Sequence, residues 1–366
     1  MKKCRWFNDA AAAATLMIDD LTNGYLDLGQ AGLTPANDWG FGCRGPQSIF
    51  GYFERILLGK YPEIRYTVFL PFGRHSIGLV DGGYTSVAHG AFESKEFVAL
   101  MRHILNEKQE IAYHGHHHGS PTPSLSPETW VGEHRYVGND LYRKTLQEDR
   151  RRLFEVLGAE LSGGKSPGYD SEPDLAKVIG DSGFRWWVFD FAPHRRTCRY
   201  RERLLDFPAN LAGDLFSPSP RPLKARITRF RAEYRVQKLI ERGGILAIQE
   251  HFLSTRPDGR RQTPNVHDDI NSLDYLFSLL RGNDIWFATC GEIARYCDSR
   301  DHTEIVVQEP GIYRLVYNGT WSAPQLSVAC ETRLLQNTAT GQVIRGSRKR
   351  GRWVFNGLTV ATYREM

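Results

Sequence analysis

Short apolar runs alternate with amphipathic segments along the first three hundred residues. Runs rich in β-branched and aromatic residues predict strands, and segments with apolar residues at helical spacing predict helices between them. The expected strands are 13–18, 66–70, 110–113, 186–191, 245–249 and 285–288. The expected helices are 46–58, 94–105, 140–157, 267–280 and 291–296, with a further helix start at 171–174. Strands that alternate with helices favour βα units in a largely parallel sheet or barrel, and both an open sheet and a closed barrel fit this pattern.

The pattern changes after about residue 301 to short β-rich segments without intervening helices. These segments are 303–308, 313–317, 326–330, 332–335, 342–344, 353–355 and 359–363. Thr340-Gly341 and Asn356-Gly357 are residue pairs typical of hairpin turns. We therefore expect two domains, a large α/β domain at 1–301 and a small antiparallel, β-sandwich-like domain at 302–366.

The composition is that of an ordinary globular protein, with 41% hydrophobic and 24% charged residues in 366. Disordered and fibrous classes are excluded on these fractions. The longest apolar stretches, 10–18 and 66–72, are shorter than the ~20 residues that a membrane helix needs. Polar residues Asn8 and Asp9 interrupt any secretory signal, so a cytoplasmic location is expected. Six scattered cysteines without ligand spacing indicate reduced, buried thiols.

The net charge of +5 is mild, but basic residues gather in two stretches, 195–203 and 221–235. Each is interpreted as a solvated face or, alternatively, as a contact for the phosphate of a nucleotide- or lipid-linked sugar or for an anionic membrane surface. No nucleic-acid recognition motif accompanies the charge, so nucleic acid is not an expected partner.

Two strand ends carry side chains that suit a metal site. The strand at 13–18 ends in the adjacent carboxylates Asp19 and Asp20. The strand at 110–113 runs directly into four histidines within five residues, at 114–118. His114 and His118 stand four apart, which in one helical turn puts both imidazoles on one side. Two imidazoles and a carboxylate suit zinc or another divalent transition metal and leave positions for water and substrate.

Two further strand ends carry weaker signals. Lys165 is followed by a Pro-Gly turn at Pro167 and Gly168, and the strand at 245–249 leads to His251. Taken alone, the first is an ordinary turn and the second a structural histidine. Beside a metal site, His251 becomes a candidate general acid, because imidazole titrates near neutrality.

Taken in order, these four motifs resemble the polysaccharide deacetylase family (NodB homology, carbohydrate esterase family 4) over residues 10–298. The resemblance implies a distorted (β/α) barrel. It makes Asp19 the general base and gives the metal ligands as Asp20, His114 and His118. Lys165-Ser166-Pro167 resembles the family's Arg-x-Pro motif, and His251 resembles its histidine after an apolar strand.

The same resemblance assigns the remaining site residues. Asp190, after the aromatic strand, would orient the basic residue Lys165. Pro167, Gly168 and Tyr169 would line the substrate and oxyanion position, with the Gly168 N–H as a donor. Three departures indicate a divergent member: Gly115 stands where a hydroxyl residue is usual, Leu21 where glycine is usual, and Lys165 where arginine is usual.

The function that the resemblance implies is metal-dependent hydrolysis of an amide that removes an N-acetyl or formyl group from a sugar. Zinc is the expected metal, with cobalt, manganese and nickel as alternatives. The absent signal and the basic stretches favour a substrate in bacterial surface polysaccharide or lipopolysaccharide O-antigen biosynthesis. A homo-oligomer is compatible with the sequence.

Two other functions stay open at this point. His114-Gly-His116 is also a His-x-His pair after a strand, as in amidohydrolases with (β/α)8 barrels, and there His116 would be the second ligand. The chain could also be a non-catalytic carbohydrate-binding protein that keeps the deacetylase fold. The small β domain would then be a glycan-binding module or a dimer contact.

Overall fold

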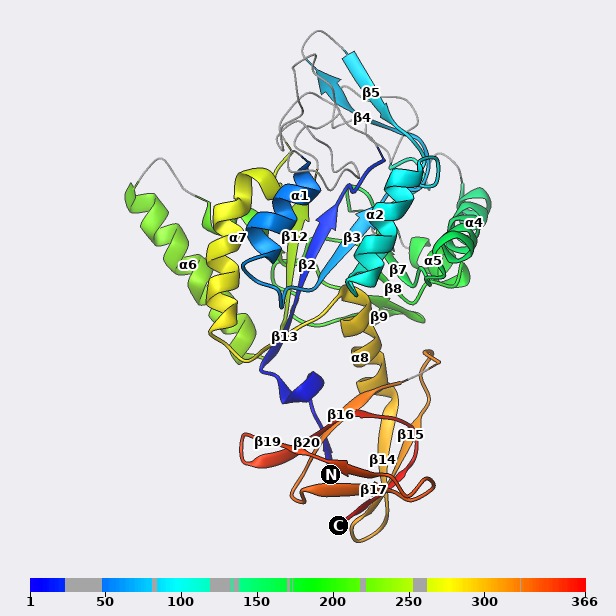
Figure 1. Cartoon of the computed structure of the whole chain (residues 1–366), viewed down its shortest axis with the longest axis vertical. Helices are drawn as coiled ribbons and strands as arrows, with labels where there is room; N and C mark the ends of the chain where they lie inside the picture. The colour runs from blue at the N-terminus through cyan, green and yellow to red at the C-terminus, as the bar shows by residue number, and fades with distance from the viewer. Residues whose placement is uncertain are drawn as a thin grey trace.

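The computed structural model (Figure 1) describes residues 1–23, 48–80, 84–118, 133, 138–169, 172, 174–217, 222–252, 262–322 and 324–366, with backbone alone at 75–80, 84–87 and 222–225. The described helices are α1 (Ile49–Phe53), α2 (Lys95–Asn106), α4 (Asn139–Leu157), α5 (Leu175–Asp181), α6 (Pro222–Glu241), α7 (Val266–Arg281) and α8 (Cys290–His302). Short helical turns are η1 (Phe7–Asp9), η2 (Glu54–Leu58, a π-helix) and η4 (Gly213–Phe216). Within these residues no helix is long and apolar enough to cross a membrane.

A large, mainly parallel sheet forms the centre of the molecule. In spatial order its strands are β11 (Leu211–Ala212), β12 (Ile245–His251), β2 (Ala12–Asp19), β3 (Tyr66–Leu70), β6 (Glu110–Tyr113), β7 (Gly163–Lys165), β8 (Trp186–Val188), β10 (Leu204–Asp206) and β9 (Arg199–Arg201). β9 is antiparallel to β10, and β13 (Ile285–Phe287) pairs with the start of β2. β4 (His75–Val80) and β5 (Tyr84–Ala88) form a separate hairpin.

The sheet curls until its two sides almost meet. A single parallel bridge between Phe191 and Ala209 links the chain after β8 to the chain before β11. The strands from β11 to β8 therefore form an incompletely closed ring. This answers the question that the hydrophobic pattern left open, and it confirms the predicted distorted (β/α) barrel.

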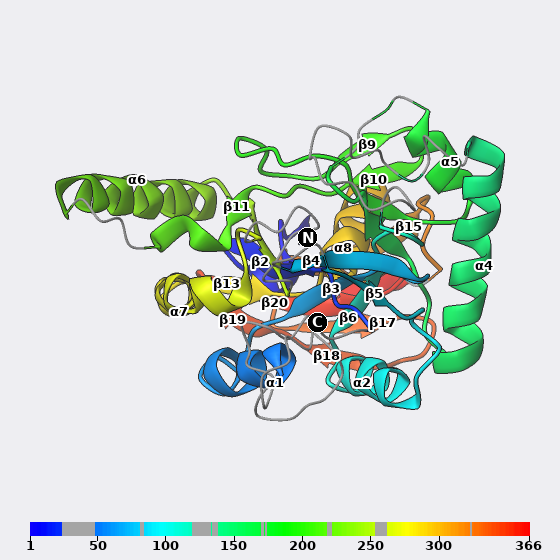
Figure 2. The same cartoon turned by 90° about the horizontal axis from the view of Figure 1, so that it is seen from above.

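The central strand β2 is apolar on both faces because both faces are covered, as in parallel sheets generally. Ala14, Leu16 and Ile18 belong to the outer core, which also contains side chains of the surrounding helices. Ala13 and Met17 belong to the inner core together with side chains of α8. The helices α1, α2, α4, α5, α6 and α7 lie around the outside of the ring (Figure 2). The inner core fills one end of the barrel and leaves the site at the other.

The chain after α8 forms two antiparallel sheets. One has the order β1 (Lys2–Lys3), β16 (Leu326–Cys330), β20 (Arg352–Leu358) and β19 (Ser347–Lys349). The other has the order β14 (Thr303–Glu309), β15 (Ile312–Tyr317), β21 (Thr362–Glu365), β17 (Leu334–Asn337) and β18 (Val343–Arg345). Apolar side chains of both sheets, among them Leu315, Val328 and Phe355, form one buried cluster. The first strand of the chain, β1, joins the first of these sheets. Residues 2–3 therefore pair with the C-terminal part, although the predicted division at 301/302 assigns them to the large domain.

Several expected elements differ from those observed. Asn356-Gly357 does not join two strands: it lies inside β20, next to a register shift against β16, and Gly357 has a φ of 69°. Thr340-Gly341 does lie between β17 and β18. The expected helix start at 171–174 falls partly outside the described residues, as do positions 46 and 47 and Cys43. The sequence pattern missed α6, the β4–β5 hairpin and the short strands β7, β9, β10 and β11.

Candidate metal and catalytic site

The predicted site residues meet at the carboxyl ends of neighbouring parallel strands, where α/β folds place ligands. Asp19 is the last residue of β2, and His251 is the last residue of β12, directly opposite it in the pairing register. His114 follows β6, and Lys165 ends β7. The strand order β12, β2, β3, β6, β7 therefore brings residues that lie more than two hundred positions apart into one site.

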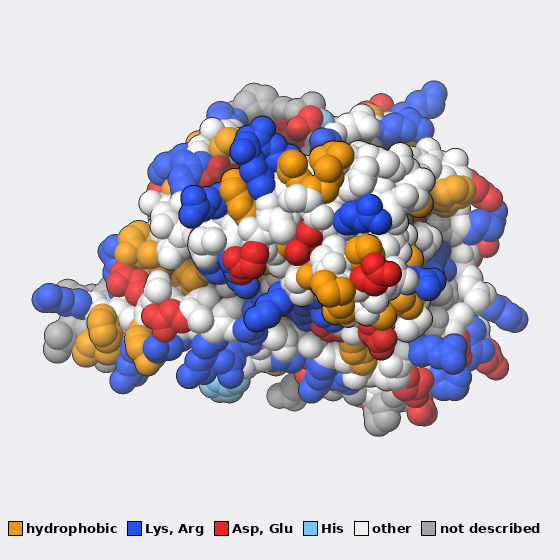
Figure 3. All heavy atoms as spheres, turned by 90° about the horizontal axis from the view of Figure 1, so that it is seen from below, with side chains coloured by type: hydrophobic (Ala, Val, Ile, Leu, Met, Phe, Trp, Pro, Cys, Tyr) orange, Lys and Arg blue, Asp and Glu red, His pale blue; other side chains and the backbone are white. Residues whose placement is uncertain are grey.

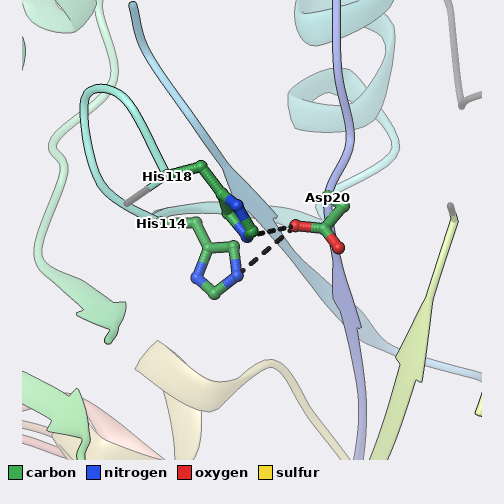
Figure 4. Close-up of side chains that lie close together, drawn as sticks. All are labelled: Asp20, His114 and His118. Carbon is green, nitrogen blue, oxygen red and sulfur yellow. Dashed lines mark ion pairs between the residues drawn. The ribbon is translucent and has the colours of Figure 1, made fainter. Parts of the chain in front are cut away.

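Asp20, His114 and His118 form the one group of possible metal ligands found within the described part of the chain (Figure 4). Their nearest ligand atoms all lie within 4.8 Å of one another. The Nε2 atoms of His118 and His114 lie 2.9 and 3.5 Å from Asp20 Oδ1. Asp20 and His114 are buried, and His118 is partly exposed. This arrangement places two nitrogens and one oxygen around a common point that is open on one side.

The His114 ring is held in the form that a metal needs. Its Nδ1 lies 3.1 Å from the carbonyl oxygen of Lys165. A carbonyl oxygen only accepts, so Nδ1 must carry the proton, and the Nε2 lone pair is left facing Asp20. Burial lowers the pKa of His114 to about 4, which keeps the imidazole neutral near pH 7.

The loop that carries the histidines has a backbone shape that explains Gly115. Gly115 has a φ of 85°, and a Cβ there would lie 2.9 Å from the Glu133 carboxylate and 3.2 Å from Pro167. Glu133 accepts hydrogen bonds from the backbone N–H groups of His116 and His117. This turn brings the His114–His118 loop against the Pro167 loop and leaves little space for a side chain at position 115. The turn therefore explains why a glycine, and not a residue with a hydroxyl group, occupies this position.

His116 is not part of the metal-ligand group. Its Nδ1 lies 2.9 Å from Asp149 Oδ2, and Asp149 also accepts a hydrogen bond from the Tyr113 hydroxyl. The pairing of His114 with His116 that an amidohydrolase would need is therefore not formed. Asp149 and Glu133 together hold the loop in place.

Asp19 lies beside the metal-ligand group and is fixed through one of its two oxygens. Lys165 Nζ donates to Asp19 Oδ2 at 2.5 Å, and Gln249 Nε2 donates to the same oxygen at 2.9 Å. Asp19 Oδ1 is buried and has no hydrogen-bond partner among the described residues. Burial would raise the pKa of Asp19, but Lys165, His114 and His251 hold it below its usual value. The carboxylate is thus held in one orientation, with one oxygen that accepts no hydrogen bond from the described residues.

Gln249 is a site residue that the sequence motifs did not identify. Its Oε1 accepts hydrogen bonds from Lys165 Nζ and from the Tyr169 hydroxyl, the latter at 3.1 Å. The amide therefore links Asp19, Lys165 and Tyr169 in one hydrogen-bond network. The alternation of side chains along a strand could have revealed it, because Gln249 stands two residues before His251 and so faces the same side of β12.

His251 is oriented toward the site by a backbone contact. Its Nδ1 lies 2.7 Å from the carbonyl oxygen of Pro264, and its Nε2 lies 3.7 Å from Asp19 Oδ2. Since the Pro264 carbonyl can only accept, Nδ1 carries a proton. Nε2 is then the nitrogen that can gain or give a proton at the site.

The expected contact between Asp190 and Lys165 is not observed, and this is a correction. Asp190 instead forms ion pairs of 3.3 to 3.6 Å with three arginines of the following segment, Arg195, Arg199 and Arg201. The same arginines also pair with the buried Asp206. Much of the first basic stretch is therefore used inside the fold, and Gln249 occupies the place next to Lys165 that Asp190 was expected to fill.

The Pro167–Tyr169 turn lies at the edge of the site. Pro167 is buried against the His114–His118 loop, and Gly168 is exposed. Gly168 and Tyr169 have left-handed φ angles of 63° and 59°. The Tyr169 ring lies 4.3 Å from Lys165 Nζ and 6.2 Å from the Phe191 ring. The turn thus forms a wall between Lys165 and the chain that follows β8.

No protein-family model and no curated protein matches the chain, but solved structures do. A Mycobacterium smegmatis protein assigned as a polysaccharide deacetylase is 19% identical, with 85% of this chain and 98% of that chain covered and a TM-score of 0.49. The chain is similar to polysaccharide deacetylases of known structure.

Two further solved structures that the chain resembles are an esterase and a pseudoenzyme. A family 4 acetyl xylan esterase from Clostridium thermocellum, solved with a cobalt ion, is 14% identical, covering 77% of this chain and 89% of that chain, with a TM-score of 0.38. A carbohydrate esterase family 4 pseudoenzyme from Bacillus anthracis is also 14% identical, covering 77% and 65%, with a TM-score of 0.36. These likenesses concern the fold.

Proposed function

We propose that the chain is a metal-dependent hydrolase that removes an N-acetyl or formyl group from a sugar. The observation that carries the proposal is the position of Asp19. Its Oδ2 lies 3.7 Å from His114 Nε2 and is held by Lys165 and Gln249, while its buried Oδ1 has no hydrogen-bond partner among the described residues. A metal site beside a fixed carboxylate is the arrangement that hydrolysis of an amide by water requires.

The residues present fit a divalent transition metal. Asp20 Oδ1 is buried between two imidazole nitrogens, and the tautomer of His114 leaves its Nε2 lone pair toward that point. A set of two nitrogens and one carboxylate oxygen suits zinc first, with cobalt, manganese or nickel as alternatives. When bound, such a metal would polarise the acyl carbonyl and a water molecule.

The protein's own residues would then carry the protons. Asp19 Oδ1 would take a proton from the attacking water, whose oxygen bonds to the acyl carbon. The Gly168 N–H would donate to the developing oxyanion. The proton taken by Asp19 would pass to His251 Nε2 and from there to the amine as the carbon–nitrogen bond breaks, which yields a free amino sugar and acetate or formate.

The proposed substrate is a nucleotide- or lipid-linked sugar in bacterial surface polysaccharide assembly, such as that of lipopolysaccharide O-antigen. The net charge of +5 is consistent with this choice, because a basic protein surface favours a phosphate-bearing substrate. The cytoplasmic location and a homo-oligomeric state stay predictions. Activity on a neutral chitin oligomer that does not change with salt would count against this choice of substrate.

The metal content of purified wild type and three single variants tests the site, together with acetate release from a panel of N-acetyl sugars. We expect Asp20→Ala and His118→Ala to lose the metal, because each removes a ligand. We expect His116→Ala to keep it, because His116 binds Asp149 instead.

Two results would contradict the proposal in different ways. Metal retained in Asp20→Ala but lost in His116→Ala would favour the amidohydrolase interpretation. Metal bound with the predicted ligand dependence, but no acetate or formate released from any substrate, would favour a non-catalytic carbohydrate-binding protein.

A further inference from the structure

The outer face of α6 carries apolar side chains that no described part of the chain covers. Ile227, Phe230 and Tyr234 are 47%, 69% and 57% exposed. They stand at positions i, i+3 and i+7, which places them along one side of the helix. α6 projects from the body of the molecule (Figure 2). Every residue from 226 to 231 is exposed, so this part of the helix has no buried face of its own.

The opposite side of α6 attaches it to the barrel. Ala232, Val236, Leu239 and Ile240 are buried there, and the Arg235 guanidinium donates to the backbone carbonyls of Pro193 and Asn210. At 3.6 residues per turn, the buried set and the exposed apolar set fall on opposite sides. The exposed apolar side chains therefore do not belong to the side of α6 that packs on the barrel. They form a second, outward face of the helix.

Basic side chains flank this outward face. Arg226 and Arg231 form no ion pair with any described residue, whereas Arg229 and Lys238 are paired with Glu233 and Glu241. In Figure 3 hydrophobic side chains at the projecting end of the molecule lie among Lys and Arg side chains, and further Lys and Arg side chains continue toward the middle of this face.

The basic surface extends past the end of the helix. Arg242, directly after α6, lines a hollow of about 620 Å³ together with Arg5, Arg196 and His194. Within the described chain none of these three arginines has an acidic partner at ion-pair distance, and the pKa of Arg5 is lowered by burial and by Arg300 and Arg196. The outward face and the hollow together present unneutralised positive charge beside exposed apolar groups.

We propose that the outer face of α6 docks onto an anionic lipid bilayer. Ile227, Phe230 and Tyr234 would enter the boundary between headgroups and acyl chains, and Arg226, Arg231 and Arg242 would contact anionic headgroups. Apolar and aromatic side chains on one helical face with arginines beside them are the composition of interfacial helices. Docking of this kind does not depend on which bond the site cleaves.

Other occupants fit this surface less well. A second copy paired through α6 by two-fold symmetry would bring the unneutralised arginines of both chains together. A nucleic acid would place its phosphates against Phe230 and Ile227, which offer no hydrogen bond.

Sedimentation of the full-length chain with vesicles tests the proposal. We expect binding to vesicles of phosphatidylcholine with phosphatidylglycerol, weak or no binding to phosphatidylcholine alone, and release as salt is raised. The double variants Ile227→Ser/Phe230→Ser and Arg226→Gln/Arg231→Gln should each weaken binding about tenfold. All four positions are exposed, so the variants should unfold at the wild-type temperature.

Matched controls separate this face from general surface effects. Phe154 on α4 is 62% exposed, and Arg203 is exposed between β9 and β10. Phe154→Ser and Arg203→Gln should leave vesicle binding unchanged. The proposal is overturned if the wild type binds no vesicles, if the controls weaken binding as much as the α6 variants, or if light scattering shows a dimer that Ile227→Ser/Phe230→Ser converts to monomer.

Discussion

Lys165 Nζ lies 2.5 Å from Asp19 Oδ2, and both side chains are almost completely buried. Two unit charges at this distance in a buried site fix each other's position strongly, provided that their other hydrogen bonds are made. Gln249 makes those bonds to both partners. Lys165 thus holds the Asp19 carboxylate through one direct contact.

Replacement of Lys165 by methionine should lower kcat about 100-fold, because the Asp19 carboxylate is then free to rotate away from the attacking water. Lys165→Arg keeps the charge and should retain more activity. Steady-state kinetics with metal content measured in parallel checks this. Wild-type kcat in Lys165→Met would mean that Asp19 is not held in this way.

Gln249→Leu should lower kcat about tenfold without loss of metal, because Asp19 loses one of two donors and Lys165 loses an acceptor. Tyr169→Phe is the matched control, since it removes only the hydroxyl that donates to Gln249. A Tyr169→Phe effect as large as that of Gln249→Leu would show that the tyrosine, rather than the amide, acts on the base.

Asp149→Leu should reduce the free energy of unfolding by about 1–3 kcal/mol, because the buried Tyr113 hydroxyl and His116 Nδ1 lose their acceptor. Asp140, exposed at the start of the same helix, provides the control variant Asp140→Leu. Urea denaturation of both variants measures the difference. Equal stability of the two would contradict a holding role for Asp149.

The contribution of Glu110 to stability should fall as the pH rises from about 4.5 to about 7. Burial raises the pKa of Glu110 from 4.5 to about 7, although Gly291 N–H and the Thr67 hydroxyl donate to it. A raised pKa means that this group's contribution is complete below the unfolded value and is lost as the pH passes the folded value. Glu110→Gln cannot ionise, so its unfolding free energy should decline less over this window. Parallel wild-type and variant curves would contradict the assignment.

Gly163→Ala should destabilise the fold by about 3 kcal/mol, because its Cβ would lie 1.8 Å from the Trp186 ring. Gly180 on α5 has nothing within 4 Å of such a Cβ, so Gly180→Ala should be neutral or slightly stabilising. Thermal unfolding of the pair checks this. A stable Gly163→Ala variant would mean that Trp186 has room to move.

The sequence identified the bounds of three strands in which apolar residues predominate. Tyr66–Leu70, Glu110–Tyr113 and Leu326–Cys330 have the predicted bounds, since each is bounded by polar residues or turns. β7 consists of Gly163, Gly164 and Lys165 and has no apolar run to detect. Its glycines are there because the Trp186 and Trp187 rings occupy the space of their side chains.

The site was predictable where its chemistry is local in sequence. Asp19 and Asp20 are neighbours in the sequence, and His114 and His118 share one loop. Each pair could therefore be recognised as a candidate from its spacing in the sequence. Gln249 and the true partners of Asp190 depend on strand order, and no spacing in the sequence encodes which arginines fold back onto which carboxylate. The residue types missed are therefore those whose role arises only from tertiary contact.

The pairing of β1 with β16 adds a second connection between the barrel and the C-terminal sheets. The chain crosses between them twice, once through residues 4–11 and once where α8 runs directly into β14. Two crossings restrict relative movement more than one would, and Asp284 beside the barrel also forms ion pairs with Lys349 and Arg350 of the C-terminal sheets. The C-terminal sheets should therefore act as a rigid base for the barrel rather than as a swinging arm, and any protein fused to either end of the chain will emerge from that base.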